Sequence, residues 1–263
     1  MIVDVINRYL LSSRKTISEA MLESVSELAK FNFSRQFGER EDFKAGVRLS
    51  SCGKCARAQA YKLHDFPVNG KEMDARSSVT FFMGDVTENM MVHLAQLAGC
   101  VLEDVGLDQK TVSIDVNGTV VKGHPDGILI HPKYGRLLLE AKSMSSFAFR
   151  RFEKGEVDHS YLCQIMSYMK AQNLDKCVML ALNKDAGVLA ELIINYDESV
   201  YINAYGRLAD ALASTPERLP EPEYGADAKG LYPWQCMYCA NWKDCHPKAQ
   251  RVLVGRSYKL KQG

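Results

Sequence analysis

The chain has 263 residues, of which 46% are hydrophobic and 25% are charged. These are ordinary values for a globular protein, so they exclude an intrinsically disordered chain. Its 33 lysine and arginine residues are balanced by 32 aspartate and glutamate residues, so the total charge neither favours nor excludes binding to nucleic acid. No apolar run reaches the roughly 18 residues of a membrane span. Asp4 and Arg8 interrupt the apolar start of the chain, so we expect no signal peptide.

The hydrophobic pattern predicts helices in the first part of the chain. Two helices are expected over residues 1–35, and the second carries an apolar stripe that includes Leu22 and Val25. A short helix is expected after Ser50 and a long one over residues 78–98. The long helix is predicted to bury Phe82, Val86, Met90 and Leu94.

After residue 110 the pattern becomes that of strands. Residues 111–130 are predicted to form two strands around the turn pair Asn117-Gly118, and residues 136–143 a third. Two more strands are expected over 176–184 and 187–195, and helices over 144–155, 158–173 and 198–214. This order predicts an α/β fold with a central mixed β-sheet flanked by helices. The chain lacks the phosphate-binding pattern GxxxxGK followed by Ser or Thr, so it is not itself an ATP-driven motor.

Charged side chains enter an apolar strand at residues 140–142. Glu140 and Lys142 are two residues apart, so in a strand they point to the same face, and three leucines precede them. Burying a carboxylate and an ammonium group costs free energy unless they are paired or bind a metal. Asp126 lies in the preceding strand among apolar residues. Two carboxylates at a sheet edge suit Mg²⁺ or Mn²⁺, whereas a turn at Asp126 and a surface ion pair are the alternative.

Two predicted helices add candidate residues. Gln164 and Tyr168 are four residues apart and share one helix face, where a plain core helix would carry Leu or Met. Glu88 follows Gly84 by four residues, and we expect Gly84 to allow another backbone to approach closely. Glu88 is therefore a candidate third carboxylate, with a solvated helix acid as the alternative.

Asp126, Glu140-x-Lys142 and Gln164-x-x-x-Tyr168, in this order, resemble the PD-(D/E)XK nuclease superfamily. The Gln-x-x-x-Tyr element resembles its RecB-like branch, whose upstream Gly-x-x-x-Glu element is similar to Gly84–Glu88. The resemblance implies a restriction-endonuclease-like core that hydrolyses phosphodiester bonds.

The resemblance also implies roles for these residues. Asp126, Glu140, Glu88 and the carbonyl of Ala141 would hold one or two divalent ions, Mg²⁺ or Mn²⁺, that polarise the phosphate and activate a water. Lys142 would orient or deprotonate that water and stabilise the developing charge. Gln164 and Tyr168 would position the lysine, the phosphate or the DNA strand.

Five of the eight cysteines form two groups, whereas Cys100, Cys163 and Cys177 are isolated and expected in the core. Cys236-x-x-Cys239 and Cys245 lie close together, which in a reducing compartment predicts a bound metal or an iron–sulfur cluster. A fourth ligand would come from Cys52 or Cys55. Cys52-x-x-Cys55 with Cys236-x-x-Cys239 would form a four-thiolate zinc site but would leave Cys245 unused.

One upstream cysteine with Cys-x2-Cys-x5-Cys resembles the iron–sulfur staple of the CRISPR-associated RecB-like exonucleases and the AddAB nuclease subunit. Cys55, with Arg57 and Tyr61, fits the upstream context of those families. The resemblance implies a 4Fe–4S cluster held by Cys55, Cys236, Cys239 and Cys245. It divides the chain into N-terminal helices (1–45), a nuclease core (46–215) and a C-terminal iron–sulfur knuckle with a basic tail (216–263). The cluster would join the N- and C-terminal segments.

Arg150 and Arg151, together with Phe147, Phe149 and Phe152, directly follow the strand of Glu140. This aromatic and basic helix is predicted to line the path of a single strand by stacking and charge. Residues 241–263 add a basic tail of Lys243, Lys248, Arg251, Arg256, Lys259 and Lys261.

The leading hypothesis is a metal-dependent DNA exonuclease that prefers single strands or DNA ends, with endonuclease activity as a second mode. The alternatives are a catalytically inactive nuclease-fold protein that binds DNA or acts as a scaffold, and a zinc-stapled binding protein. The expected partners are DNA and helicase, recombination or CRISPR adaptation proteins. The expected compartment is the cytoplasm of a prokaryotic cell or of a virus-infected host cell.

Overall fold

A computed structural model describes residues 1–13, 16–38, 46–70, 75–255 and 257–263. Four helices precede the sheet, as the sequence predicts: α1 (Ile2–Leu11), α2 (Glu19–Phe37), α3 (Ala56–Leu63) and α4 (Ala75–Leu97). The predicted boundary at residue 45 lies in the stretch 39–45, outside the described residues. Among the helices that the structure describes, none is long and apolar enough to cross a membrane.

Five strands form the central sheet in the order β1-β4-β5-β6-β7. Their bounds are β1 (Val101–Glu103), β4 (Gly127–His131), β5 (Gly135–Met144), β6 (Lys176–Asn183) and β7 (Val188–Asn195). Strands β5 and β6 are parallel, and the other neighbouring pairs are antiparallel. Helices α5 (Ser146–Phe152) and α6 (His159–Gln172) lie in the connection between the parallel strands, and α7 (Glu198–Leu212) follows the sheet. The fold is the mixed α/β architecture that the sequence predicts.

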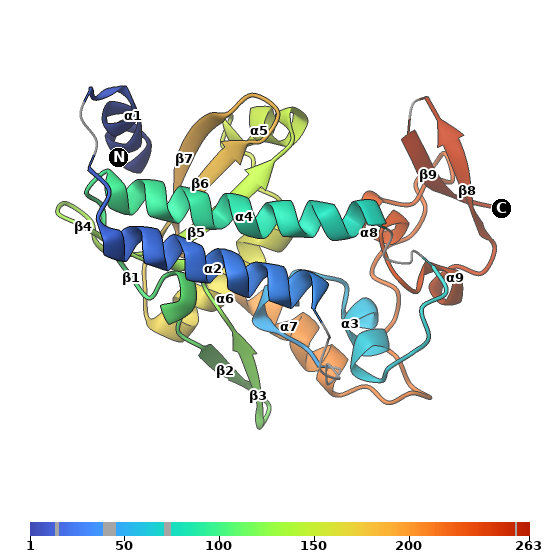
Figure 1. Ribbon diagram of the computed structural model, residues 1–263. Helices are drawn as coiled ribbons and strands as arrows, with labels where there is room; N and C mark the ends of the chain where they lie inside the picture. The colour runs from blue at the N-terminus through green and yellow to red at the C-terminus, as the bar shows by residue number, and fades with distance from the viewer. Residues whose placement is uncertain (14–15, 39–45, 71–74, 256) are drawn as a thin grey trace.

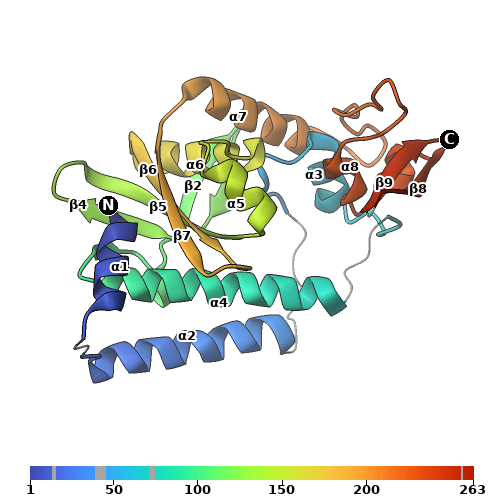
Figure 2. The ribbon, with the colours of Figure 1, turned by 90° about the horizontal axis from the view of Figure 1, so that it is seen from above.

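Helices cover both faces of this sheet. Helix α4 lies on one face with α2 outside it, and α6 and α7 lie on the other (Figure 2). The alternation of β5 places Leu138 in the core cluster that includes Ile165 of α6. Leu139 belongs to the second core cluster, with Met91 of α4. Burial on both faces explains the continuous apolar run before Glu140.

The hairpin around Asn117-Gly118 is confirmed, but its surroundings differ from the prediction. Strands β2 (Val112–Val116) and β3 (Thr119–Gly123) form their own two-stranded sheet. Asn117 and Gly118 both have positive φ angles, 52° and 85°, as a two-residue hairpin turn requires. The chain then leaves the strand at His124-Pro125-Asp126, so residues 111–130 form three strands rather than two. Pro125 has no N–H to continue a ladder, which explains the break.

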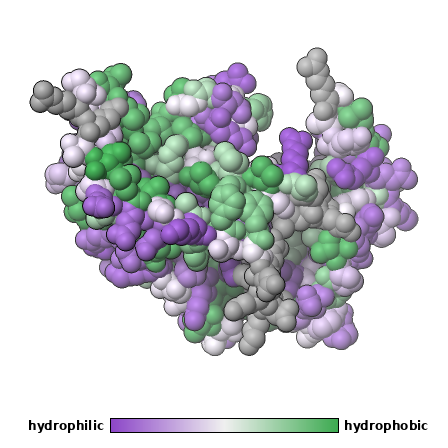
Figure 3. Space-filling model, in the orientation of Figure 1, coloured by the Kyte–Doolittle hydropathy of each residue, from purple (hydrophilic) through white to green (hydrophobic). Residues whose placement is uncertain are grey.

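The predicted buried face of α4 is wrong in part. Val86 and Met90 are 38% and 43% exposed, and Figure 3 shows apolar side chains gathered along this helix. Met91 and Ala95 are the residues buried against the sheet. Phe82 instead packs in an aromatic cluster against Phe33 and Phe37 of α2. Because α4 contacts both α2 and the sheet, it is apolar around most of its circumference and its pattern does not identify one face.

Gly84 also differs from its prediction. A Cβ atom at this position would meet nothing within 4 Å, so no backbone approaches there and the space does not require glycine.

The segment that carries the C-terminal cysteines contains two short helices and a hairpin. These are α8 (Trp234–Met237), α9 (Trp242–Cys245), β8 (Ala249–Val254) and β9 (Ser257–Gln262). The hairpin of β8 and β9 was not predicted; the sequence analysis predicted only a basic tail there. Of the tail residues, Arg256 lies outside the described residues.

One glycine does mark a close approach, and we expect its replacement to destabilise the protein. A Cβ atom at Gly123 would lie 2.5 Å from Cε1 of Tyr168 and 2.8 Å from Cβ of Leu49. Overpacking of this kind costs about 1–3 kcal/mol. Gly123→Ala should therefore lower the free energy of unfolding by that amount in urea denaturation.

The matched control for this change is Gly206→Ala, in the interior of α7. A Cβ atom at Gly206 would meet nothing within 4 Å, so alanine should be neutral or stabilising there by up to about 1 kcal/mol. Equal stability of Gly123→Ala and the wild type would contradict the packing described here.

Candidate active site

Asp126 and Glu140 lie together at the start of β4 and within β5. Their side chains are 6% and 0% exposed. The backbone N–H of Ala141 donates a hydrogen bond to Oδ2 of Asp126 at 2.8 Å, which fixes this carboxylate against β5. Gly127 of β4 pairs with Leu139 of β5 in antiparallel register. This pairing brings Asp126, the residue before Gly127, opposite Glu140.

The Lys142 ammonium group lies between these carboxylates. Its Nζ is 2.6 Å from Oε1 of Glu140 and 3.6 Å from Oδ2 of Asp126. It also donates to the carbonyl oxygen of Ala141 at 3.1 Å. The Lys142 side chain is 20% exposed, whereas that of Glu140 is 0% exposed. The structure therefore brings together the four residues Asp126, Glu140, Ala141 and Lys142.

Gln164 joins this cluster, whereas Tyr168 supports it from the core. The side-chain amide of Gln164 donates to Oε1 of Glu140 at 2.8 Å. Tyr168 is 1% exposed, and the backbone of His124 makes a hydrogen bond with its hydroxyl group. Because His124 lies two residues before Asp126, Tyr168 holds the turn that presents this carboxylate. Because Tyr168 does not reach the surface, its side chain is not placed to contact a DNA strand.

Glu88 of α4 belongs to the same electrostatic group. Burial raises the pKa of Glu88 well above its usual range, and the nearby charge of Asp126 adds to this effect. The side-chain amide of Gln109 lies 3.5 Å from Oε1 of Glu88, a long contact. The charges of three carboxylates, from α4, the turn before β4 and β5, thus all act on Lys142.

The carboxylates of this cluster are suited to binding a cation. Burial raises the pKa of Glu140 to about 7, although the charge of Lys142 acts in the opposite direction. Oε2 of Glu140 is buried and accepts no hydrogen bond from the described residues. An unpartnered buried oxygen among three carboxylates fits a hard divalent ion. In the described part of the chain, no three His, Cys, Asp or Glu side chains are arranged to hold a metal ion. The positive charge of Lys142 lies beside the Glu140 carboxylate.

The electrostatics of Lys142 distinguish between its two expected roles. Burial lowers the pKa of Lys142, but Asp126, Glu140 and Glu88 more than offset this, and the pKa lies well above its ordinary value. The ammonium group therefore keeps its proton at neutral pH. This favours orientation and charge stabilisation by Lys142 over removal of a proton from water.

The helix after β5 provides only part of the predicted DNA-binding surface. Arg150 and Arg151 are exposed on α5, and Nε of Arg151 donates to Glu156 at 2.8 Å. Phe149 and Phe152 are 2% and 1% exposed, so their expected role in stacking is wrong. They pack in the core because α5 must bury one face against the sheet.

The cysteines separate into two environments. Cys52 is fully buried in the main core, where its sulfur lies 3.4 Å from Oγ of Ser167. Cys55 is the N-cap residue of α3, and its charge would act on Cys236, Cys239 and Cys245. Of the two upstream cysteines, Cys55 is therefore the one that lies near the C-terminal group. Cys163 and Cys177 are buried in the core, as predicted, whereas Cys100 is only half-buried beside the second core cluster.

The C-terminal thiols resist ionisation in the absence of a bound cation. Burial raises the pKa of Cys236 to about 12 and that of Cys245 to about 11, and the neighbouring thiols add to both shifts. Nε2 of His246 lies 3.6 Å from the sulfur of Cys236, a contact that sequence reasoning missed. The signal was available, because His246 directly follows Cys245.

Backbone contacts hold the cysteine-bearing segment against the N-terminal half of the chain. Gly70 donates to the carbonyl of Ala240 at 2.6 Å, and the side chain of Asn241 donates to the carbonyl of Pro67 at 2.9 Å. Arg57 donates to the carbonyl of Pro220 at 2.9 Å. These contacts hold α3 and the loop after it beside the segment of α8 and α9, at one end of the molecule in Figure 1.

The fold is similar to that in the crystal structure of SSO0001. The TM-score is 0.52 with 18% sequence identity, and the match covers 86% of this chain and 97% of that chain. A match to an alkaline exonuclease from Laribacter hongkongensis has a TM-score of 0.43 and 13% identity and covers 70% of this chain and 91% of that one. A phage related exonuclease from Haemophilus somnus 129PT matches at 0.40 and 13%, over 64% and 92%. No protein-family model and no curated protein matches the sequence.

Proposed function

We propose that the protein is a divalent-metal-dependent deoxyribonuclease of the PD-(D/E)XK superfamily, in its RecB-like branch. The observation that carries this proposal is the meeting of Asp126, Glu140 and Lys142 where β4 begins beside the central strand β5, with the buried Oε2 of Glu140 left unpartnered. The motif residues come from separate parts of the chain, so a chance sequence pattern would not bring them together. The preferred substrates are single strands or DNA ends.

Mg²⁺ or Mn²⁺, when bound by Asp126, Glu140, Glu88 and the carbonyl of Ala141, would supply Lewis-acid activation of the phosphate and of a water. The residues of the chain prepare the site for this chemistry. The Ala141 N–H fixes Asp126, and Gln164 orients Glu140. Lys142 would stabilise negative charge on the phosphate oxygens through its ammonium group, which lies beside Glu140 and Asp126.

The direct test is the hydrolysis of labelled DNA. Single-stranded DNA, blunt duplex DNA and RNA of the same sequence are incubated with the protein in Mg²⁺ or Mn²⁺ and then with EDTA. We expect metal-dependent cleavage of single-stranded DNA, with products that report the direction of degradation. No cleavage of any substrate in either metal would favour the alternative of a DNA-binding or scaffolding protein.

We further propose a 4Fe–4S cluster held by Cys55, Cys236, Cys239 and Cys245. The support is that the charge of Cys55 would act on Cys236, Cys239 and Cys245, and that Cys52 lies in the core, away from the alternative zinc ligand set; among the described residues these thiols do not yet converge on a metal site. Thiolates need positive charge nearby, and Arg57 supplies it beside Cys245. Anaerobic purification followed by iron, sulfide and zinc analysis tests this ligand set, and a colourless zinc protein would overturn it.

Metal binding should also stabilise the folded protein. At a free Mg²⁺ or Mn²⁺ concentration ten times the dissociation constant, linkage gives about 1.4 kcal/mol, which raises the melting temperature by about 3–6 °C for a chain of this size. Because the pKa of Glu140 is raised to about 7, this carboxyl group must lose a proton to bind metal below that pH. We therefore expect a larger shift at pH 8 than at pH 6. Thermal melts with and without metal measure it, and an equal shift in Asp126→Asn would contradict the assignment.

A further inference from the structure

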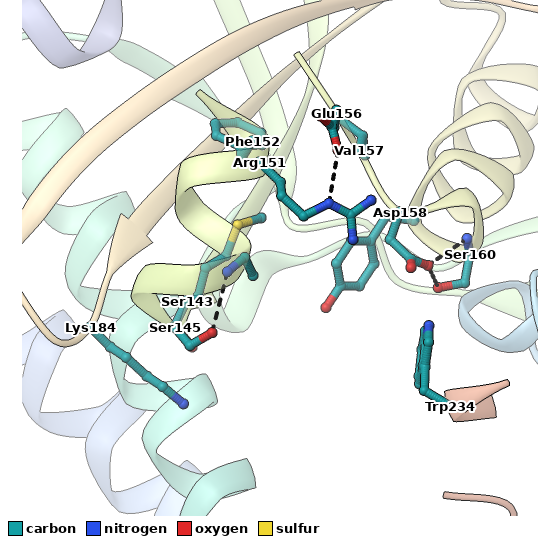
Figure 4. A pocket seen from close by; sticks show the side chains of 13 residues that line it. Ser143, Ser145, Arg151, Phe152, Glu156, Val157, Asp158, Ser160, Lys184 and Trp234 are labelled. Atoms are coloured by element: carbon teal, nitrogen blue, oxygen red, sulfur yellow. Dashed lines mark hydrogen bonds and ion pairs between the residues drawn. The ribbon is translucent and has the colours of Figure 1, made fainter. Parts of the chain in front are cut away.

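A cavity of about 340 Å³ lies beside the candidate active site. It is enclosed by the end of β5, helix α5, the N-terminal end of α6 and the cysteine-bearing segment, and Figure 4 shows its interior. Pockets that hold small ligands have volumes of about 300–1,000 Å³, so this cavity suits a ligand at the small end of that range.

The cavity comes near the active site at Tyr161. Ser143, another lining residue, follows Lys142 on β5, so the alternation of the strand turns it to the other face. Tyr161, which also lines the cavity, has its ring centroid 5.9 Å from Nζ of Lys142. A ligand in the cavity would therefore lie next to the cation that we place against the phosphate.

Trp234 forms one wall of this cavity. It is the first residue of α8, two residues before Cys236, and its side chain is 54% exposed. Figure 4 shows Trp234 and Lys184 on opposite sides of the opening, with Arg151 between them. An exposed indole beside a small cavity is a typical platform for a nucleic-acid base.

The charges around the cavity are divided between paired and available groups. Arg151 is paired with Glu156, and Asp158 accepts from Ser160 at the start of α6. Lys184 follows the end of β6; among the described residues it makes no ion pair, and the adjacent carboxylate, Asp185, accepts a hydrogen bond from the N–H of Ser146. Lys184 is therefore the cation that an incoming phosphate can contact without breaking an existing pair.

We propose that this cavity receives one unpaired nucleotide of a single DNA strand. Its base stacks on Trp234 and its phosphate contacts Lys184, which presents the adjacent phosphodiester to Lys142. This inference rests on the proposed function and deepens it. Because the bases of an intact duplex are already stacked on each other, such a site selects an unpaired strand or a frayed end. The segment that carries Cys236 would thus contribute to substrate choice as well as to stability.

Intrinsic fluorescence provides a direct test, because the chain has only two tryptophans and Trp242 is 6% exposed. The protein is titrated with a short oligothymidylate in EDTA, which prevents hydrolysis. We expect the emission of Trp234 to fall on binding in the wild type. In Trp234→Phe this change should disappear while the affinity, measured by anisotropy of a labelled oligonucleotide, stays within about twofold, since phenylalanine also stacks. An unchanged wild-type emission at saturation overturns the proposal, as does an equal change with a blunt duplex.

Two truncations measure the separate contributions of stacking and charge. Trp234→Ala should weaken oligonucleotide binding by about tenfold, whereas Tyr258→Ala, an exposed aromatic of β9 outside the cavity, should not. Lys184→Gln should reduce the slope of log affinity against log salt by about 0.7. Its matched control is Lys176→Gln at the opposite end of the same strand. Wild-type affinity in Trp234→Ala would overturn the base-stacking site.

The outcomes distinguish this inference from the proposed function. If the wild type cleaves DNA in Mg²⁺ or Mn²⁺ but shows none of these effects, the nuclease assignment stands and the nucleotide site is wrong. If the wild type cleaves no DNA at all, the proposed function is wrong, whatever the fluorescence shows.

Discussion

Asp126→Asn lowers the rate of DNA hydrolysis by about a thousandfold or more, the largest effect that we expect from one substitution. The amide keeps the size of the carboxylate and can still accept the hydrogen bond from Ala141, but it removes one negative charge from the proposed metal site. Metal activation contributes several kcal/mol to such reactions, and each 1.36 kcal/mol changes the rate about tenfold. Initial rates on labelled single-stranded DNA in Mg²⁺ measure the effect.

The matched control for this substitution is Asp104→Asn. Asp104 also pairs with a lysine, since its Oδ1 lies 2.8 Å from Nζ of Lys110, and the ion pairs of Lys142 involve Asp126 and Glu140 instead. Asp104 has a positive φ angle of 56°, which asparagine also adopts readily, so the backbone is unaffected. We expect wild-type rates from it. A rate for Asp126→Asn within tenfold of the wild type would remove the case for metal-dependent hydrolysis at this site.

Asp126→Asn is a cleaner test than removal of Lys142. Removal of the Lys142 ammonium group would leave Glu140 and Asp126 as buried carboxylates with no cation between them. Breaking a buried ion pair in this way costs about 3–5 kcal/mol, so Lys142→Ala would combine a folding defect with a catalytic one. Thermal melts would be needed to separate the two.

Cys236→Ala is expected to lower the melting temperature by about 10 °C or more and to remove the visible absorption of the cluster. In the proposed ligand set, Cys55 and Cys236 close a loop of more than 100 residues. By analogy with a disulfide, closing such a loop restricts the unfolded chain by about 4–5 kcal/mol. Each kcal/mol of stability changes the melting temperature of a chain of this size by about 2–4 °C, so the loss of this restriction accounts for the expected decrease. Anaerobic purification, a visible spectrum and a thermal melt measure both effects.

The control for the loss of a thiol is Cys100→Ala. Cys100 is half-buried beside the second core cluster, among residues that include Leu102 and Ala98. Its replacement should retain the colour and shift the melting temperature by only a few degrees, as expected for a small side chain that is not fully buried. If Cys236→Ala has the colour and melting temperature of the wild type, the four-cysteine site is wrong.

The sequence predicts the fold well where the hydrophobic period is clear. The strand of Glu140, its neighbour 176–184 and the helix of Gln164 all lie where alternation or helical spacing indicates. Strand β1, with only three residues, is too short to produce a pattern. The hairpin β8–β9 was missed because its basic residues suggested a tail. Most side chains of this two-stranded hairpin are exposed, so its strands contain few apolar residues from which alternation could be recognised.

The candidate site is predictable in its local parts and unpredictable in its long-range parts. The period of a strand is enough to place Glu140 and Lys142 on one face. The depth of Tyr168 depends on the space left by Gly123, which no pattern in α6 reveals. Burial of Phe149 and Phe152 depends on which face of a two-turn helix meets the sheet. The approach of Trp234 to α5 depends on tertiary contacts between residues that are more than 80 positions apart in the sequence.

The separation of the two cysteine groups along the chain affects how the protein matures in the cell. Cys55 leaves the ribosome long before Cys236, Cys239 and Cys245 are synthesised. The complete thiol set exists only once these late residues have emerged and the segment that carries them has docked near Pro67 and Gly70. On the proposed ligand set, cluster insertion would therefore follow the folding of the sheet. A shortage of iron would therefore reduce the yield of mature protein but would not prevent the sheet from starting to fold.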